Sequence, residues 1–115
     1  MTGGSWVTQA DRAPWQRRAV GELAAILDAH PGLPLIAWTI GPAGGLSGRV
    51  NGLAPAAGVR AAFAAWQQAL ALDDVLETVS DGGAAVWLRA RAWRGVVRVT
   101  ITATVLTRDQ RAVTA

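Results

Sequence analysis

The sequence predicts an α+β fold, a two-layer α/β sandwich with two helices on one face of a mostly antiparallel five-stranded sheet. Three observations lead to this prediction. The chain has 115 residues, of which 51% are apolar and six are tryptophan, enough for one core in one domain. Two segments place apolar residues at helical spacing, and five shorter ones alternate apolar with polar residues as half-buried strands do. The order is α-β-β-α-β-β-β, and short turns between consecutive strands favour antiparallel pairing.

The folded domain is expected to span residues 13–107. Residues 1–12 are rich in Gly, Ser and Thr and lack apolar periodicity, so they are predicted to form a flexible N-terminal arm with Trp6 as its candidate anchor. Residues 108–115 are predicted to be a polar C-terminal tail.

Two helices are predicted. The first begins at Pro14, whose missing N–H costs nothing in a first turn, and ends at Ala29. Its solvent face includes Glu22, and its core face holds Trp15, Ala19, Leu23, Ile26 and Leu27. The second begins near Pro55, with Arg60 pointing outward. Its apolar stripe consists of Val59, Ala62, Phe63, Trp66, Ala69 and Leu70.

A first hairpin is predicted around the Gly-rich turn at residues 41–45. The residues before this turn alternate with a period of two, and pairing Ile40 with Leu46 sets Trp38 opposite Gly48. In this register the bulky apolar residues share one face of the hairpin. The register also explains the glycine, because Gly48 leaves room for the Trp38 indole.

Three further strands complete the predicted sheet. Residues 75–80 form a short strand before an Asp-Gly-Gly turn at residues 81–83, and two-residue and three-residue loops remain alternative registers there. The last hairpin is predicted to turn at residues 94–95. That register places Arg91 opposite Arg98, a like-charge pair that an acidic neighbour or an anionic partner would have to offset.

Composition excludes several classes of protein. The absence of cysteine excludes a disulfide framework and thiolate metal or redox chemistry. The N-terminus lacks a secretory signal, and the longest uncharged stretch contains prolines that exclude a continuous membrane helix. We therefore expect a cytoplasmic protein without a membrane partner. The net charge of +3 permits nucleic-acid binding but does not indicate it, because binding needs a localised patch.

The acid–base inventory argues against an enzyme. The single histidine, His30, ends the first helix and is predicted to cap it, and no nucleophile lies beside it in the sequence. The acidic residues at positions 73, 74, 77 and 81 approximate a cation cluster, but a helix end, a solvated strand and a turn explain them. No catalytic, metal-binding or cofactor-binding residue is assigned, and no cofactor is expected.

The outer face of the last hairpin is the candidate binding surface. Strand alternation places tryptophans and arginines of one strand beside an arginine and threonines of the next, away from the core. The predicted surface consists of Trp87, Arg89, Arg91, Trp93, Arg98, Thr100 and Thr102.

Three interpretations of this surface compete. It is an ordinary solvated face with arginine stacked on tryptophan, an interface for a second copy or another protein, or a platform for single-stranded nucleic acid. Tryptophan and arginine are enriched at interface hot spots, and the aromatic motif of RNA-recognition sheets is absent. We therefore predict a non-enzymatic protein-binding module, a homodimer or an adaptor, with weak single-stranded nucleic-acid binding as the alternative function and an enzyme as the third.

Three segments carry a resemblance to known sequences. Residues 35–42 (LIAWTIGP), 46–53 (LSGRVNGL) and 59–66 (VRAAFAAW) resemble small uncharacterised α/β proteins common in actinobacteria. The resemblance covers about residues 14–106. It implies a bacterial, cytoplasmic protein and supplies no catalytic residues, because that group has no established activity.

Overall fold

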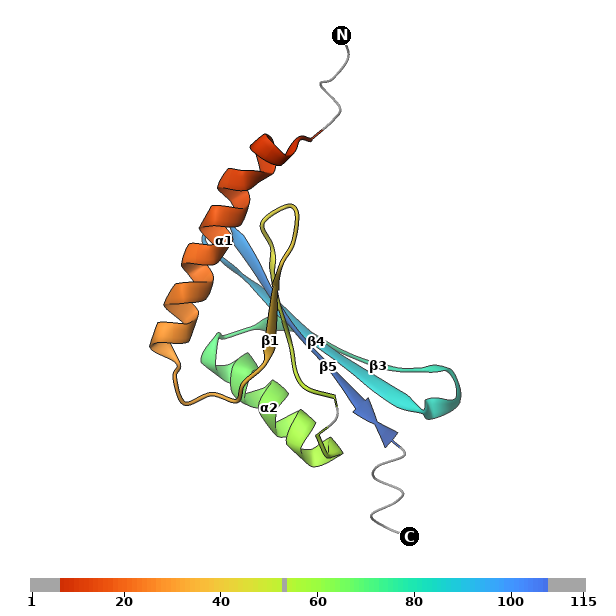
Figure 1. Cartoon of the computed structure of the whole chain (residues 1–115). Coiled ribbons are helices and arrows are strands. Elements are labelled where there is room, and N and C mark those ends of the chain that lie inside the picture. The colour runs from red at the N-terminus through yellow and green to blue at the C-terminus, as the bar shows by residue number, and fades with distance from the viewer. Residues whose placement is uncertain (1–6, 53, 108–115) are drawn as a thin grey trace.

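Two helices lie on one face of a five-stranded sheet, as predicted (Figure 1). The computed structural model describes residues 7–52 and 54–107. Its elements, in chain order, are α1 (Gln9–Ala29), β1 (Ala37–Ile40), β2 (Leu46–Arg49), α2 (Ala56–Ala69), β3 (Asp73–Val79), the short 3₁₀ turn η2 (Asp81–Gly83), β4 (Ala85–Arg94) and β5 (Val97–Leu106). Among the described residues, no helix combines the length and apolarity needed to cross a membrane.

The strand order across the sheet is β1-β2-β5-β4-β3. Each of the five strands pairs antiparallel with a sequence neighbour, and β2 also pairs with β5 in parallel. Strand β5 is therefore central, and the core face of β5 is the most deeply buried part of the sheet. Its core residues, each at most 4% exposed, are Val97, Val99, Ile101, Ala103 and Val105.

The helices contribute unequally to the core. Helix α2 packs along β5 and buries Val59, Phe63 and Trp66, as its apolar stripe predicts. Helix α1 buries only Ala19 and Ile26, which lie about two turns apart on one line of the helix. The face predicted for α1 is therefore too broad. Two of its members, Trp15 and Leu27, remain 36% and 47% exposed.

Helix α1 also begins earlier than the predicted Pro14. Thr8 caps it, because the Thr8 hydroxyl accepts a hydrogen bond from the Asp11 N–H at 3.2 Å and the Asp11 carboxylate accepts one from the Thr8 N–H at 3.0 Å. The hydrogen bonds that the Thr8 N–H and then the Thr8 hydroxyl donate to the Asp11 carboxylate lower the pKa of Asp11. The predicted arm is thus helical from Gln9 onward. Residues 1–6, with Trp6, and the predicted tail at residues 108–115 lie outside the described residues.

The first hairpin has the predicted register. Ile40 pairs with Leu46, and Trp38 pairs with Gly48. A Cβ on Gly48 would lie 2.6 Å from Cδ1 of Ile101 and 2.7 Å from Cδ1 of Ile36, closer than to the Trp38 indole at 3.3 Å. The glycine therefore makes room chiefly for the two isoleucines.

The predicted register of the last hairpin is wrong by two residues. Arg94 pairs with Val97, so Gly95 and Val96 form the turn. Gly95 has a φ of +63° and Val96 does not have a positive φ, as in a type II′ turn, which needs glycine at its first central position. Because a shift of two residues preserves the side-chain alternation, every side chain keeps its predicted face.

Candidate functional site on the open face of the sheet

The face of the sheet away from the helices is the candidate site, and we call it the open face. Cross-strand pairing of β4 with β5 brings the seven predicted residues together there. Parallel pairing of β2 with β5 adds Arg49, which the sequence prediction of the site did not include. Four cross-strand pairs build this surface: Trp87 with Thr104, Arg89 with Thr102, Arg91 with Thr100, and Trp93 with Arg98.

One row of side chains crosses three strands of the open face. Arg49 of β2 pairs with Thr102 of β5, and Thr102 pairs with Arg89 of β4. Since neighbouring strands lie about 4.8 Å apart, the backbones of the two arginines are about 10 Å apart with a hydroxyl between them. The row is a short basic stripe perpendicular to the strands.

Neither arginine of this row forms an ion pair with a carboxylate in the part of the chain that the structure describes. Within the described residues, the ion pairs join Arg60 to Glu77, Arg91 to Asp74, and Arg94 to Glu22. The Nε of Arg89 is also buried without a hydrogen-bond partner in the described chain. A buried donor without an acceptor is costly, and an external acceptor at this position would satisfy it.

The predicted contact between Arg91 and Arg98 is absent, because the corrected register separates them. Arg91 instead donates from Nε to Oδ2 of Asp74 at 2.5 Å. The hydrogen bond and charge of Arg91 lower the pKa of Asp74, with smaller contributions from Arg89 and Arg98. The carboxylate thus pairs with Arg91, whereas Arg49, Arg89 and Arg98 form no ion pair among the described residues, and we call these three the uncompensated cations of the open face.

The two tryptophans of the open face differ in their surroundings. The Cζ of Arg98 lies 5.2 Å from the Trp93 ring centroid, so one ring face is occupied by a cation. Trp87 lies between Thr104 and Thr78 and is 50% exposed. Only Trp87 offers an unoccupied ring within the described part of this surface.

Two depressions meet beside Arg49. A hollow of about 380 Å³ surrounds Arg89 and is bordered by Trp87 and Thr104. A cleft of about 780 Å³ opens where β2 leaves β5, beyond the last pair of those strands. The cleft is lined by Leu35, Ile36, Ala37, Arg49, Val50, Asn51, Gly52, Thr104 and Leu106.

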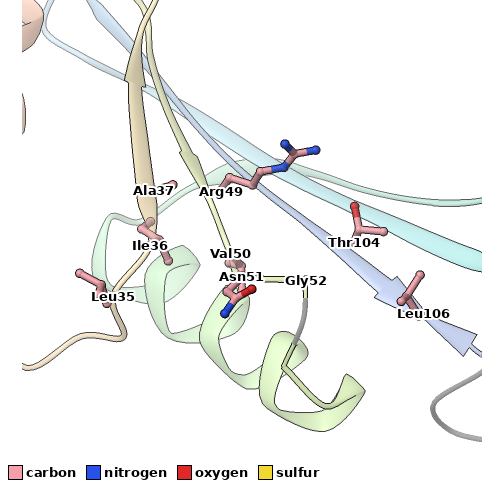
Figure 2. Close-up of a pocket in the computed structure, with 9 residues that line it drawn as sticks. All are labelled: Leu35, Ile36, Ala37, Arg49, Val50, Asn51, Gly52, Thr104 and Leu106. Carbon is pink, nitrogen blue, oxygen red and sulfur yellow. The ribbon is translucent and has the colours of Figure 1, made fainter.

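Arg49 and Thr104 border both depressions. Figure 2 shows the Arg49 guanidinium and the Thr104 side chain on the side of the sheet that faces away from α2. Most of the other lining residues of the cleft are apolar. The open face therefore places an apolar cleft directly next to an uncompensated basic row, a pairing of features that the sequence prediction missed.

The other residues considered in the sequence have structural contacts. His30 is the C-cap of α1, and its backbone N–H donates to the Ile26 carbonyl at 3.1 Å. Glu22, predicted on the solvent face, instead accepts from Arg94 at 2.7 Å, and Arg60 pairs with Glu77 at 3.0 Å. The described residues contain no group of three potential metal ligands. Comparison with family models, curated proteins and solved structures returned no match, so function is argued from this geometry alone.

Proposed function

We propose that this protein is a non-enzymatic binding module whose open face holds an acidic segment of another protein. The observation that carries the proposal is the position of the uncompensated Arg49 and Arg89 beside a cleft with mostly apolar walls. Guanidinium groups recognise carboxylates by charge-assisted hydrogen bonds, and an apolar cleft accepts an aliphatic side chain. A segment combining glutamate or aspartate with leucine or valine matches both features.

The charge of the open face argues against binding a copy of itself through this surface. In such a dimer, the row of Arg49 and Arg89 would face other uncompensated arginines, and like charges across an interface weaken association. Among the described residues, Asp74 is the carboxylate that forms an ion pair on this face, and its partner is Arg91. The partner is therefore expected to bring the negative charge.

Single-stranded nucleic acid is the alternative, and it fits less well. Such ligands bind by stacking successive bases on several aromatic rings, with phosphates on basic groups. Arg98 stacks on one face of Trp93, so within the described part of this surface Trp87 is the ring that carries no stacked cation beside the basic row. The mostly apolar cleft next to Arg49 also has no counterpart in a polynucleotide backbone.

The proposal is tested with a fluorescein-labelled synthetic peptide of glutamate and leucine, measured by fluorescence anisotropy. The double variant Arg49→Gln/Arg89→Gln should weaken binding by about tenfold or more, because two charge-assisted hydrogen bonds are lost. The matched control is Arg17→Gln/Arg18→Gln, which removes the same charge from exposed positions of α1. Equal affinity of the two double variants would overturn the proposal.

Two further ligands test which feature of the open face determines the choice of ligand. A peptide with glutamine in place of leucine should bind more weakly if the cleft accepts the aliphatic side chain. A labelled mixed-sequence single-stranded oligonucleotide of equal charge should bind more weakly than the acidic peptide. Tighter binding of the oligonucleotide, with loss of binding in Trp87→Ala, would replace the acidic protein segment by nucleic acid.

A further inference from the structure

Strand β3 is an exposed edge of the sheet. It pairs with β4 alone, and all seven of its residues are exposed. Its apolar side chains are half-exposed or more: Val75 at 53%, Leu76 at 47% and Val79 at 60%. Residues 75–79 of this edge carry one charged side chain and no lysine or proline, and such a segment is a template for pairing with another strand.

The backbone direction of β3 follows from its junction with β4. The Ser80 N–H donates to the Ala85 carbonyl at 2.9 Å, so the backbone groups of Ser80 point toward β4. β3 pairs regularly with β4 from Leu76 to Val79, so by alternation the N–H and C=O groups of Glu77 and Val79 point toward the open edge. The register shift between Asp73 and Leu76 interrupts this alternation before Leu76, so Glu77 and Val79 are the residues that supply donors and acceptors for a new strand.

The sequence of this edge is self-complementary. Residues 75–79 read Val-Leu-Glu-Thr-Val, with a β-branched apolar residue two positions to either side of Glu77. In an antiparallel pair of identical strands centred on Glu77, Val75 lies opposite Val79 of the second copy, twice by symmetry. Centring on Leu76 would instead set Val75 opposite Glu77.

The charges at the centre of this register are balanced. Two copies of Glu77 would face each other, but each already accepts a hydrogen bond from Arg60 at 3.0 Å. The centre would therefore hold two carboxylates and two guanidinium groups. At the ends of the pair, Asp73 of one copy approaches Asp81 of the other, a repulsion that salt screens.

We infer that the protein forms a homodimer by antiparallel pairing of β3 with β3 of a second copy, centred on Glu77. The inference does not depend on the proposed function. The two five-stranded sheets become one ten-stranded sheet, and the two open faces lie on the same side of it. The dimer would then present two basic rows to one partner.

Disulfide trapping tests the register, because the chain contains no cysteine of its own. In the variant Glu77→Cys, the two introduced residues face each other with Cα atoms about 5.5 Å apart, within the range of a disulfide. In the control Val79→Cys, the two copies lie four residues off register, roughly 13 Å apart. Glu77→Cys should oxidise to a covalent dimer much faster than Val79→Cys. Equal rates would refute the register.

Light scattering over a concentration series tests the dimer itself on the unmodified chain. The dimer should persist or tighten as salt is raised, and Val75→Lys should raise its dissociation constant about tenfold or more, because a charge on the edge opposes pairing. The control Thr39→Lys places the same charge on β1, the opposite edge. A monomer at every concentration would overturn the inference. Binding through the open face weakens with salt, so the failure of one proposal is distinguishable from the failure of the other.

Discussion

The guanidinium group of Arg98 lies over the Trp93 ring, with 5.2 Å between Cζ and the ring centroid. The contact exists because the two residues face each other across β4 and β5. It holds the arginine in a fixed position on the open face and covers one face of the indole. Arg98 thereby reduces the area of the Trp93 ring that a binding partner can contact, and Trp93 restricts the positions that the Arg98 guanidinium can take.

This pair should stabilise the fold by a small, measurable amount. A double-mutant cycle with Arg98→Gln and Trp93→Leu should give a coupling energy of about 0.5–1 kcal/mol in urea unfolding. The same cycle between Arg98 and Trp87, which are not paired, serves as the control and should give no coupling. A coupling of the same size in both cycles would mean that the effect is general to the strand rather than a stacking contact.

The pair of Arg91 with Asp74 should make stability depend on pH. Because Arg91 lowers the pKa of Asp74 in the folded protein, the unfolded chain binds a proton more readily as the solution becomes acidic. The contribution is therefore fully present above the ordinary aspartate pKa of about 3.9 and is lost as the pH falls through the lower folded value.

The variant Asp74→Asn tests this dependence. Wild type should be more stable than Asp74→Asn at neutral pH in urea unfolding, and the difference should shrink at pH values below the ordinary aspartate pKa. Asp81→Asn removes the same charge from η2, where it breaks no ion pair between described residues. A difference between wild type and Asp74→Asn that stays constant down to low pH would contradict the ion pair.

Gly48 should not tolerate a side chain. In Gly48→Ala the new Cβ would overlap the Cδ1 atoms of Ile36 and Ile101, which are buried and cannot move away freely. We expect a loss of about 1–3 kcal/mol in denaturant unfolding. Gly58→Ala is the control, since Gly58 lies inside α2 with no atom within 4 Å of the added group. That substitution should stabilise the protein by about 0.5–1 kcal/mol, and destabilisation by both would argue against a steric cause.

In the last hairpin, local patterns predict which face each residue occupies, but not the register. The last hairpin has the predicted faces because a shift of two residues keeps the alternation, although the turn begins at Gly95 rather than ending there. The start of α1 depends on hydrogen bonds between Thr8 and Asp11. Pro14 is the stronger signal for a first turn in the sequence, so the predicted helix begins there. Both differences between prediction and structure lie at a turn or a helix cap, where several neighbouring residues could take the same position.

The candidate site shows a different limit. The seven predicted residues lie on β4 and β5, which are joined by one turn, so their proximity follows from the sequence. Arg49 comes from β2, which meets β5 only through parallel pairing between segments about fifty residues apart. No local pattern indicates which strand lies beside the central one. The cleft beside Arg49 also depends on the pairing of β2 with β5, so it could not be predicted from the sequence either.

Trp66 should be the most sensitive aromatic position in the described core. It is 2% exposed, its Nε1–H donates to the Pro34 carbonyl at 2.8 Å, and its ring meets Trp38 edge to face with centroids 5.5 Å apart. Trp66→Phe removes the donor, leaves the Pro34 oxygen without its partner and opens a small void. We expect a loss of about 2–3 kcal/mol in the free energy of unfolding, measured by urea titration.

The matched control is Trp93→Phe, which makes the same substitution on the open face, where the indole is 60% exposed. It should change the free energy of unfolding by less than about 1 kcal/mol, because little buried area is lost. A similar loss in both variants would mean that indole size alone sets the effect. A larger loss of stability in Trp66→Phe would assign the effect to the hydrogen bond from Trp66 to the Pro34 carbonyl, which joins α2 to the segment between α1 and β1.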